Sequence, residues 1–363
     1  MTRAATFSAA DERFMRRALA LAERGRGTTR PNPVVGAVVV RGGRHEGEIV
    51  GEGFHARAGQ AHAEVNALEA LGGRAPGATL YVTLEPCSHT GRTGPCTDVV
   101  IAAKVARVVV GCRDPNPIVD GRGVQRLRRA GIRVDVGCLE AECQAAIRAY
   151  AVWIRERRPL VTLKAAATLD GYIADAYHGG TVRSKTRRRA PAWITGPDAR
   201  RAAHELRAAH DAVLVGSGTI LADDPQLTVR LPGWGRKRGP RRVVLVGKTG
   251  LPKGRRNVDR GKAPTEIIAT PDGRPDIPFV LEYLAREREV QSMLVEGGAT
   301  IHGAFIAAGL VDRVALFVAP SLIGGGVPIA RGADLPLARA LRLGSLSVRP
   351  VGKDLLVTAD VIR

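Results

Sequence analysis

The sequence predicts an α/β fold divided into two domains. Its 363 residues are more than one compact core usually needs and enough for two. Apolar runs of strand length alternate with segments whose apolar residues recur at helical spacing, and this alternation continues through both halves. Residues 139–158 have the pattern of one long amphipathic helix, which Pro159 ends. We therefore predict a first domain over 1–148, a connection over 149–159 and a second domain over 160–363.

The first half contains helix and strand patterns in alternation. The predicted helices span residues 11–24, 62–71, 97–104 and 123–131. The predicted strands span residues 34–40, 48–55, 79–84, 106–111 and 132–137. Ser8 or Asp11 is suited to cap the first helix, and Gly25 to end it. The run VVGAVVV at 34–40 is almost wholly apolar, which predicts a strand buried on both faces.

The second half continues the alternation, and no sequence repeat relates it to the first. It opens with the strand pattern of residues 160–174. Further strands are predicted over residues 211–216, 241–247, 265–270, 292–298, 313–320 and 354–362. Helices are predicted over residues 197–210, 278–288 and 300–309. This order is again typical of an α/β architecture.

Composition narrows the class of protein. The net charge of +20 is carried mostly by arginines scattered through both halves, which favours solvated helix faces over one nucleic-acid surface. Aromatic residues make up only 4%, so stacking platforms for single-stranded nucleic acid are mostly missing. The five cysteines are an odd number without a secretory segment, which indicates a reducing compartment. No apolar run approaches the roughly 18 residues of a membrane span, so we expect a cytoplasmic protein.

Four residues between positions 62 and 96 have the pattern of a catalytic zinc site. His62 and Glu64 form an H-x-E pair at a predicted helix start, Cys87 follows a proline at a strand end, and Cys96 precedes another helix. Zinc nucleobase deaminases carry H-x-E followed by P-C-x-x-C, and the spacing between the two cysteines is wider here. One imidazole and two thiolates leave the fourth tetrahedral position for water. Glu64 is then placed to take a proton from that water and pass it to a leaving amine. A closed structural zinc site, with His89 as fourth ligand, is the alternative.

Long ordered stretches of the chain resemble the bifunctional riboflavin-biosynthesis deaminase–reductases. In the first half these are TTRPNPVVGAVVV, HAEVNAL, YVTLEPCSHTGRTGPC and RDPNP. In the second half they are LKAAATLDGYIA, WITGPDAR, LRAAHDAVLVGSGTILADDPQLTVR and LVEGGATIHGAF. The resemblance implies a cytidine-deaminase-like three-layer domain followed by a dihydrofolate-reductase-like α/β domain. It also implies two consecutive reactions on a phosphorylated pyrimidine: zinc-dependent removal of a ring amine, then NADPH-dependent reduction of the ribosyl chain to ribityl. Homo-oligomers are expected.

The resemblance also implies roles for individual residues. In the first half, His62, Cys87 and Cys96 are the expected zinc ligands and Glu64 the proton shuttle. Asn32, which also suits a turn between its two prolines, and the loop residue Arg92 are expected to contact the pyrimidine and the phosphate respectively. In the second half the expected substrate contacts are Arg207, Leu227, Arg230 and Glu296. The expected NADPH contacts are Ala167, Trp193, Thr219, Asp223, Gly247, Lys248 and the run Gly298, Ala299, Thr300, Ile301, His302, Gly303 and Ala304. Lys164 or Asp223 is expected to supply the proton that accompanies hydride addition.

One stretch departs from the family pattern. The connection over 175–192 is long and strongly basic, and Pro191 stands where the family usually has a substrate-contacting serine. It is interpreted as a surface insertion, a lid over a phosphorylated substrate or a weak nucleic-acid contact.

Three other functions stay open for the whole chain: a deaminase with an impaired reductase domain, a nucleic-acid-acting zinc deaminase, and a purely structural zinc protein.

Overall fold

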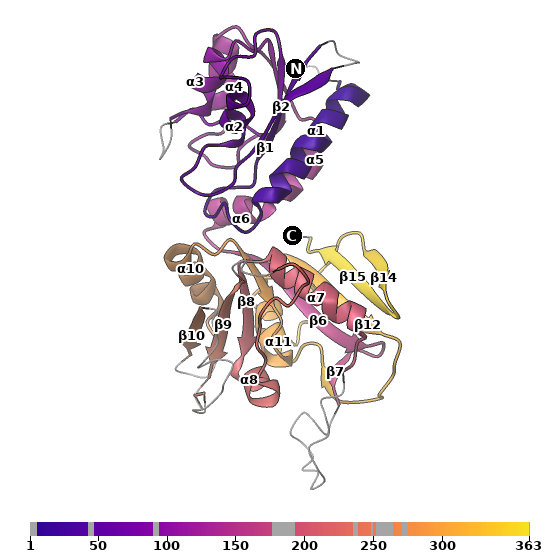
Figure 1. Ribbon diagram of the computed structural model, residues 1–363. Coiled ribbons are helices and arrows are strands. Elements are labelled where there is room, and N and C mark those ends of the chain that lie inside the picture. The colour runs from indigo at the N-terminus through magenta and orange to yellow at the C-terminus, as the bar shows by residue number, and fades with distance from the viewer. Residues whose placement is uncertain are drawn as a thin grey trace. The chain divides into compact units, whose positions relative to one another are not determined.

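The computed structural model divides into two compact units, residues 1–157 and 158–363. The residues that it describes are 6–42, 47–89, 94–175, 193–234, 239–247, 250–251, 264–270 and 275–362. Each unit is an α/β body with its own sheet (Figure 1). No helix in the described part of the chain combines the length and apolar character that a bilayer span requires.

The first unit is built on a five-stranded sheet in the order β2-β1-β3-β4-β5. Its strands are β1 (Gly36–Arg41), β2 (Glu48–Phe54), β3 (Thr79–Leu84), β4 (Arg107–Cys112) and β5 (Arg133–Val136). Strand β1 is antiparallel to both its neighbours, whereas β3, β4 and β5 are mutually parallel. The first five residues of β1 are buried, which confirms the prediction of a strand covered on both faces.

Helices cover both faces of this sheet, which makes the unit three-layered. One face carries α2 (Ala63–Glu69), α3 (Cys96–Ala102) and α4 (Arg122–Arg129). The other carries α1 (Ala9–Ala22), which runs into a 3-10 turn (Glu23–Gly25), and α5 (Glu140–Ala146). The strands supply both cores because successive side chains point to opposite faces.

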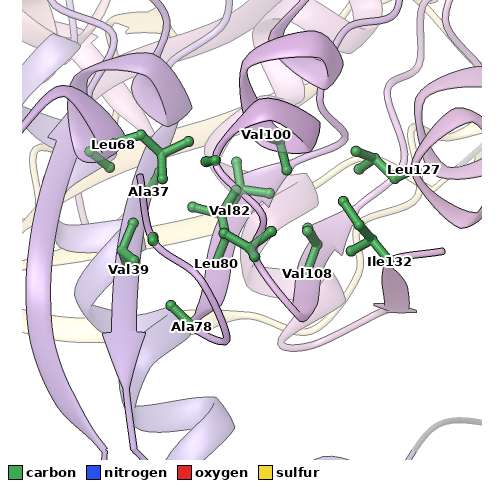
Figure 2. Packing of buried hydrophobic residues seen from close by; sticks show 14 of the residues in the cluster. Ala37, Val39, Leu68, Ala78, Leu80, Val82, Val100, Val108, Leu127 and Ile132 are labelled. Atoms are coloured by element: carbon green, nitrogen blue, oxygen red, sulfur yellow. The ribbon is translucent and has the colours of Figure 1, made fainter. Parts of the chain in front are cut away.

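Strand β3 illustrates this alternation. Its residues Leu80 and Val82 belong to the core under α2, α3 and α4, and Tyr81 belongs to the core under α1. Figure 2 shows the first of these cores, with Leu68 of α2 and Leu127 of α4 among its members.

The prediction of one helix over 139–158 is wrong. Helix α5 ends at Ala146, and a second helix, α6 (Arg148–Glu156), begins after Ile147. Ile147 leaves the helical conformation, with φ −103° and ψ 10°, and its side chain is buried in the core that α1 covers. Tertiary packing at this residue therefore divides a stretch that is helical by its local pattern.

The second unit contains an eight-stranded sheet in the order β10-β9-β8-β11-β6-β12-β15-β14. Its strands are β6 (Leu160–Thr168), β8 (Ala212–Gly216), β9 (Arg241–Val246), β10 (Thr265–Ala269), β11 (Ser292–Val295), β12 (Arg313–Ala319), β14 (Ser347–Val351) and β15 (Asp354–Asp360). The run from β10 to β12 is parallel, and β15 and β14 are antiparallel. A separate pair joins β7 (Tyr172–Ala174) and β13 (Val327–Pro328).

Helices again lie on both faces of the large sheet. Helices α10 (Ile277–Arg288) and α11 (Ala299–Ala307) share one apolar core with the strands. Helices α7 (Pro197–Ala209) and α8 (Ser217–Asp223) contribute to two smaller cores, and a 3-10 turn spans Leu337–Arg339. Within β8, Leu214 belongs to the first core and Val213 and Val215 to one of the smaller cores, so the helix pairs cover opposite faces.

Candidate functional site

Three metal-ligating side chains of the first unit meet at the ends of two helices. His62 is the N-cap of α2, Cys96 is the first residue of α3, and Cys87 follows the end of β3. Nδ1 of His62 lies 3.1 Å from Sγ of Cys96 and 3.7 Å from Sγ of Cys87. The ligand atoms of the three residues all lie within 4.8 Å of one another. A nitrogen and two sulfurs at these separations fit a tetrahedral zinc ion with one further coordination position.

Among the described residues, this group of possible ligands contains three members and His89 is not one of them. The structure therefore gives no support to a closed site that uses His89. Arg92, expected at the substrate phosphate, lies outside the described residues.

The two thiols of the group titrate as a pair. A hydrogen bond from Cys96 lowers the pKa of Cys87 to about 4, and the same contact raises the pKa of Cys96. The main-chain N–H of Cys96 also donates to Sγ of Cys87 over 3.3 Å. One proton is thus shared by the two sulfurs, and a divalent cation bound between them would favour both thiolates.

Glu64 is buried beside this group. It is the second residue of α2 and its side chain is 3% exposed. Burial raises the pKa of Glu64 to about 7, and the charge of His62 opposes that rise. A carboxyl group with a pKa near neutrality can accept and release a proton in the same catalytic cycle.

A second histidine, which the sequence did not single out, orients Asn32. Nδ1 of His55 lies 3.1 Å from the carbonyl oxygen of Ala61, and a carbonyl only accepts, so Nδ1 carries the proton. Nε2 of His55 then accepts from Nδ2 of Asn32 over 3.0 Å. The Oδ1 atom of Asn32 is therefore the end that remains for another donor. The ring of His55 also packs edge-on against His62, with centroids 5.1 Å apart.

A buried carboxylate fixes the segment that carries Cys87. Glu85 accepts from the main-chain N–H groups of Gly121, Val124 and Asp114 at 3.0, 3.1 and 3.3 Å. The start of α4 is thereby tied to the end of β3. The packing is so close that a Cβ on Gly123 would come within 2.0 Å of the carbonyl oxygen of Pro86.

In the second unit, charged side chains gather at the carboxyl ends of the parallel strands. Glu296 follows the end of β11, and Arg207 of α7 donates to its two oxygens at 2.5 and 2.9 Å. Nζ of Lys164, on β6, lies 3.7 Å from Glu296. Burial opposes ionisation of Glu296, but Lys164 and Arg207 outweigh it and hold its pKa at about 2. Ligands of open α/β sheets bind at this edge.

The remaining expected substrate contacts differ in accessibility. Arg230 is exposed and donates to the side chains of Gln226 and Thr228. Leu227 is 3% exposed and has a positive φ of 53°, so only its main chain can face a ligand. His204, which the sequence did not indicate, lies near Arg230, and burial lowers its pKa together with the neighbouring arginine charges.

Most of the expected NADPH contacts follow the ends of β8, β9 and β11. Thr219 and Asp223 lie in α8, directly after β8, and Gly247 follows β9. Ala167 is buried within β6, Trp193 is 68% exposed, and Lys248 lies outside the described residues. The run from Gly298 to Ala304 comprises the N-cap and first residues of α11.

The glycines at these strand ends permit close approach of the main chain. A Cβ on Gly297 would lie 2.7 Å from Cα of Val215, and Gly298 has a φ of +70°. Helix α11 begins there, so its free N–H groups face the edge where an anionic group would bind. Two residues of the run have packing roles: Nδ1 of His302 lies 2.8 Å from the carbonyl of Ile329, and Gly303 lies against the carbonyl of Arg331.

Comparisons with known proteins cover nearly the whole chain. Residues 8–112 match the family model for the cytidine and deoxycytidylate deaminase zinc-binding region, and residues 159–357 match the RibD C-terminal domain. The riboflavin biosynthesis protein RibD of Escherichia coli is 42% identical, over 95% of this chain and 97% of its own. Its counterpart from Aquifex aeolicus is 39% identical, over 96% and 97%.

Solved structures also match nearly the whole chain. RibD of Acinetobacter baumannii superposes with a TM-score of 0.85 at 34% identity, covering 98% of this chain and 99% of that one. A diaminohydroxyphosphoribosylaminopyrimidine deaminase/5-amino-6-(5-phosphoribosylamino)uracil reductase from Thermotoga maritima gives 0.83 at 37% identity, covering 97% and 99%. The chain therefore belongs to the RibD family of riboflavin biosynthesis proteins.

Proposed function

We propose that this chain catalyses two consecutive steps of riboflavin biosynthesis. The first is zinc-dependent hydrolytic deamination of 2,5-diamino-6-(5-phosphoribosylamino)pyrimidin-4(3H)-one. The second is NADPH-dependent reduction of the ribosyl chain of the product to ribityl. The observation that carries the proposal is the meeting of His62, Cys87 and Cys96 beside a buried Glu64, in a chain that matches RibD proteins over almost its full length.

In the deaminase unit, His62, Cys87 and Cys96 would hold the zinc ion. The ion would supply Lewis-acid activation of a water molecule at neutral pH. Glu64 takes a proton from that water and delivers it to the amine nitrogen that leaves as ammonia. Oδ1 of Asn32, fixed by the hydrogen bond between its Nδ2 and His55, accepts from an N–H of the pyrimidine. These assignments follow from donor chemistry and placement.

In the reductase unit, the glycine-lined strand ends and the start of α11 would hold NADPH, which would supply the hydride. Lys164 is better placed than Asp223 to donate the proton that accompanies hydride addition. Its Nζ is partly buried at the carboxyl edge beside Glu296, whereas Asp223 is exposed at the end of α8. Glu296 remains ionised at neutral pH, and its charge holds Nζ of Lys164 at this edge of the sheet.

The mass of the product tests both steps. The protein is incubated with the diamino substrate, first without NADPH and then with it. A gain of about 1 mass unit, as amine becomes oxygen, followed by a gain of about 2, as hydrogen is added, is expected. The first gain without the second, together with no loss of NADPH absorbance, would instead identify a deaminase with an impaired reductase unit.

The insertion over 175–192, which favours an impaired reductase, lies outside the described part of the chain from residue 176 onward, Pro191 included. The nucleic-acid-acting alternative gains no support from the described residues. Cytoplasmic location and homo-oligomerisation stay predictions, and size-exclusion chromatography with light scattering tests the second of them.

A further inference from the structure

A half-buried histidine of the second unit lies among the cations at the carboxyl edge of its sheet. His204 is three positions before Arg207 in α7, which places the two side chains on one face of that helix. Nδ1 of His204 lies 3.4 Å from the main-chain nitrogen of Arg230. A main-chain N–H only donates, so Nδ1 accepts and the neutral ring carries its proton on Nε2. His204 therefore joins α7 to the segment that carries Arg230.

The charges around this ring are mostly positive. Arg207 and Arg230 both act on His204, and Glu296 is the carboxylate that opposes them. The charge of Glu296 is already balanced by Arg207, at 2.5 Å, and by Lys164, at 3.7 Å. Arg207, Arg230, Lys164 and Glu296 as a group therefore carry net positive charge, which suits an anionic ligand.

Both arginines keep donors for such a ligand. Arg207 uses one N–H of each of its three nitrogens on Glu296 and on the carbonyl of Thr228, so two of its five N–H groups remain. Arg230 is exposed and uses Nη1 on the side chains of Gln226 and Thr228. Its Nε and Nη2 stay available for a planar, bidentate contact, which is the way guanidinium groups bind phosphate oxygens.

His204 has a partner for each of its protonation states. Burial and the charges of Arg207 and Arg230 lower its pKa, so the ring is neutral at neutral pH. The contact of the neutral ring with the Arg230 N–H is long, at 3.4 Å, so its loss costs little. A hydrogen bond with the main chain of Thr228 and the charge of Glu296 favour the protonated ring instead. The protonation of His204 therefore depends on the charge that is placed beside it.

We propose that His204 is a further substrate contact of the reductase unit, which binds the phosphate of the deaminated substrate together with Arg207 and Arg230 and takes up a proton as it does so. This inference rests on the proposed reductase function and adds to it one residue and one proton. A dianion beside the ring offsets the two guanidinium charges, which removes their opposition to protonation. The pKa of His204 lies below its ordinary value of 6.5 in the free protein and should lie above it in the complex, so affinity should increase as the pH falls through about 6.5.

NMR of histidine-labelled protein measures the titration of this ring directly, with sulfate as the probe. Sulfate keeps its charge over the range in question, whereas a phosphate ester has a second pKa of its own at about 6. The ring signal of His204 is the one that the His204→Gln variant lacks. Its pKa should rise by about 1 or more when sulfate is added. A signal that does not respond to sulfate would overturn the contact, and an unchanged pKa would overturn the proton uptake.

Inhibition of the reduction by sulfate gives a second measurement, with the deaminated substrate and saturating NADPH. The inhibition constant of the unaltered protein should rise about 3- to 10-fold from about pH 6.5 to about pH 8, because one linked proton changes affinity at most tenfold per pH unit. Glutamine keeps a polar side chain that does not become charged, so His204→Gln should change by less than about twofold. His89→Gln is the control, because His89 is an exposed histidine of the first unit, and it should behave as the unaltered protein does. Equal pH dependence in all three proteins would overturn the proposal.

The two measurements separate this inference from the function on which it rests. If the unaltered protein does not oxidise NADPH with the deaminated substrate, the proposed reduction fails. The NMR titration needs no turnover, and it then still decides whether His204 takes up a proton when an anion binds.

Discussion

Replacing Arg207 with methionine separates two roles for this residue. The family resemblance implies a substrate contact at Arg207, whereas the structure pairs this residue with Glu296 through hydrogen bonds of 2.5 and 2.9 Å. Its third nitrogen donates to the carbonyl of Thr228 at 3.1 Å. Methionine keeps the apolar length of the side chain and removes all three donors. We expect the substitution to destabilise the second unit as well as to weaken reduction.

The magnitude follows from the burial of Glu296, whose side chain is 6% exposed. Burial alone would raise its pKa above the ordinary 4.5, but Lys164 and Arg207 bring the pKa down to about 2. That difference corresponds to about 3 kcal/mol of stability at neutral pH, shared between the two cations. Removing one partner of a buried pair typically costs about 3–5 kcal/mol. We therefore expect a loss of about 3 kcal/mol.

The assay is urea unfolding followed by tryptophan fluorescence. A Trp153→Phe background removes the tryptophan of the first unit and leaves Trp193 and Trp234 to report on the second. Because the pKa of Glu296 is lowered by folding, its contribution is complete above about pH 4.5 and is lost as the pH falls toward 2. The difference between variant and parent should shrink over the same range.

A Glu296→Gln variant and the double variant complete a thermodynamic cycle. The two substitutions should be strongly non-additive, with a coupling of at least about 2 kcal/mol. Unchanged unfolding with only a higher KM for the reductase substrate would contradict the reasoning. It would mean that Arg207 acts on the substrate alone.

Three further predictions concern the first unit. Glu64→Gln should lower deamination about 10²- to 10⁴-fold while zinc content stays the same, and equal activity would exclude Glu64 as the proton shuttle. His55→Ala should raise KM for the pyrimidine more than it lowers kcat, with His55→Gln restoring part of the loss, because a freed Asn32 amide loses its orientation. Asp11→Asn should lower unfolding free energy by about 3 kcal/mol at pH 7, since it breaks a buried pair with Arg107. Burial opposes ionisation of Asp11, but its hydrogen bonds with Arg107, Ser8 and Tyr81 outweigh burial and lower its pKa to about 2. The destabilisation caused by Asp11→Asn should therefore disappear as the pH falls from about 4 to 2, which acid-unfolding curves measure.

Much of the fold could be predicted because its signals are local. The apolar run at 79–84 coincides with β3, and the pattern over 197–210 with α7 to within one residue. Strand β14 gave no such signal, because four of its five residues are exposed and it is held by pairing with β15. The strand predicted over 292–298 ends at Val295, where Glu296 and two glycines turn toward the sheet edge.

The candidate site could be predicted only in part, because some of its contacts are formed by residues that only folding brings together. His62, Glu64, Cys87 and Cys96 are recognisable because their spacing is dictated by metal chemistry. His55 carries no such spacing, and its role depends on a carbonyl and an amide brought to it by folding. The pairing of Arg207 with Glu296 joins residues 89 positions apart, which no local pattern encodes.

The proposed function depends most on hydrolysis by the group at His62, Cys87, Cys96 and Glu64. The most direct measurement is the product mass after incubation of the zinc-loaded protein with the diamino substrate in ¹⁸O-labelled water, without NADPH. Hydrolytic attack predicts a gain of about 3 mass units, against about 1 in ordinary water, because the new oxygen comes from solvent. A substrate that keeps its mass, or a product without the label, would contradict the account.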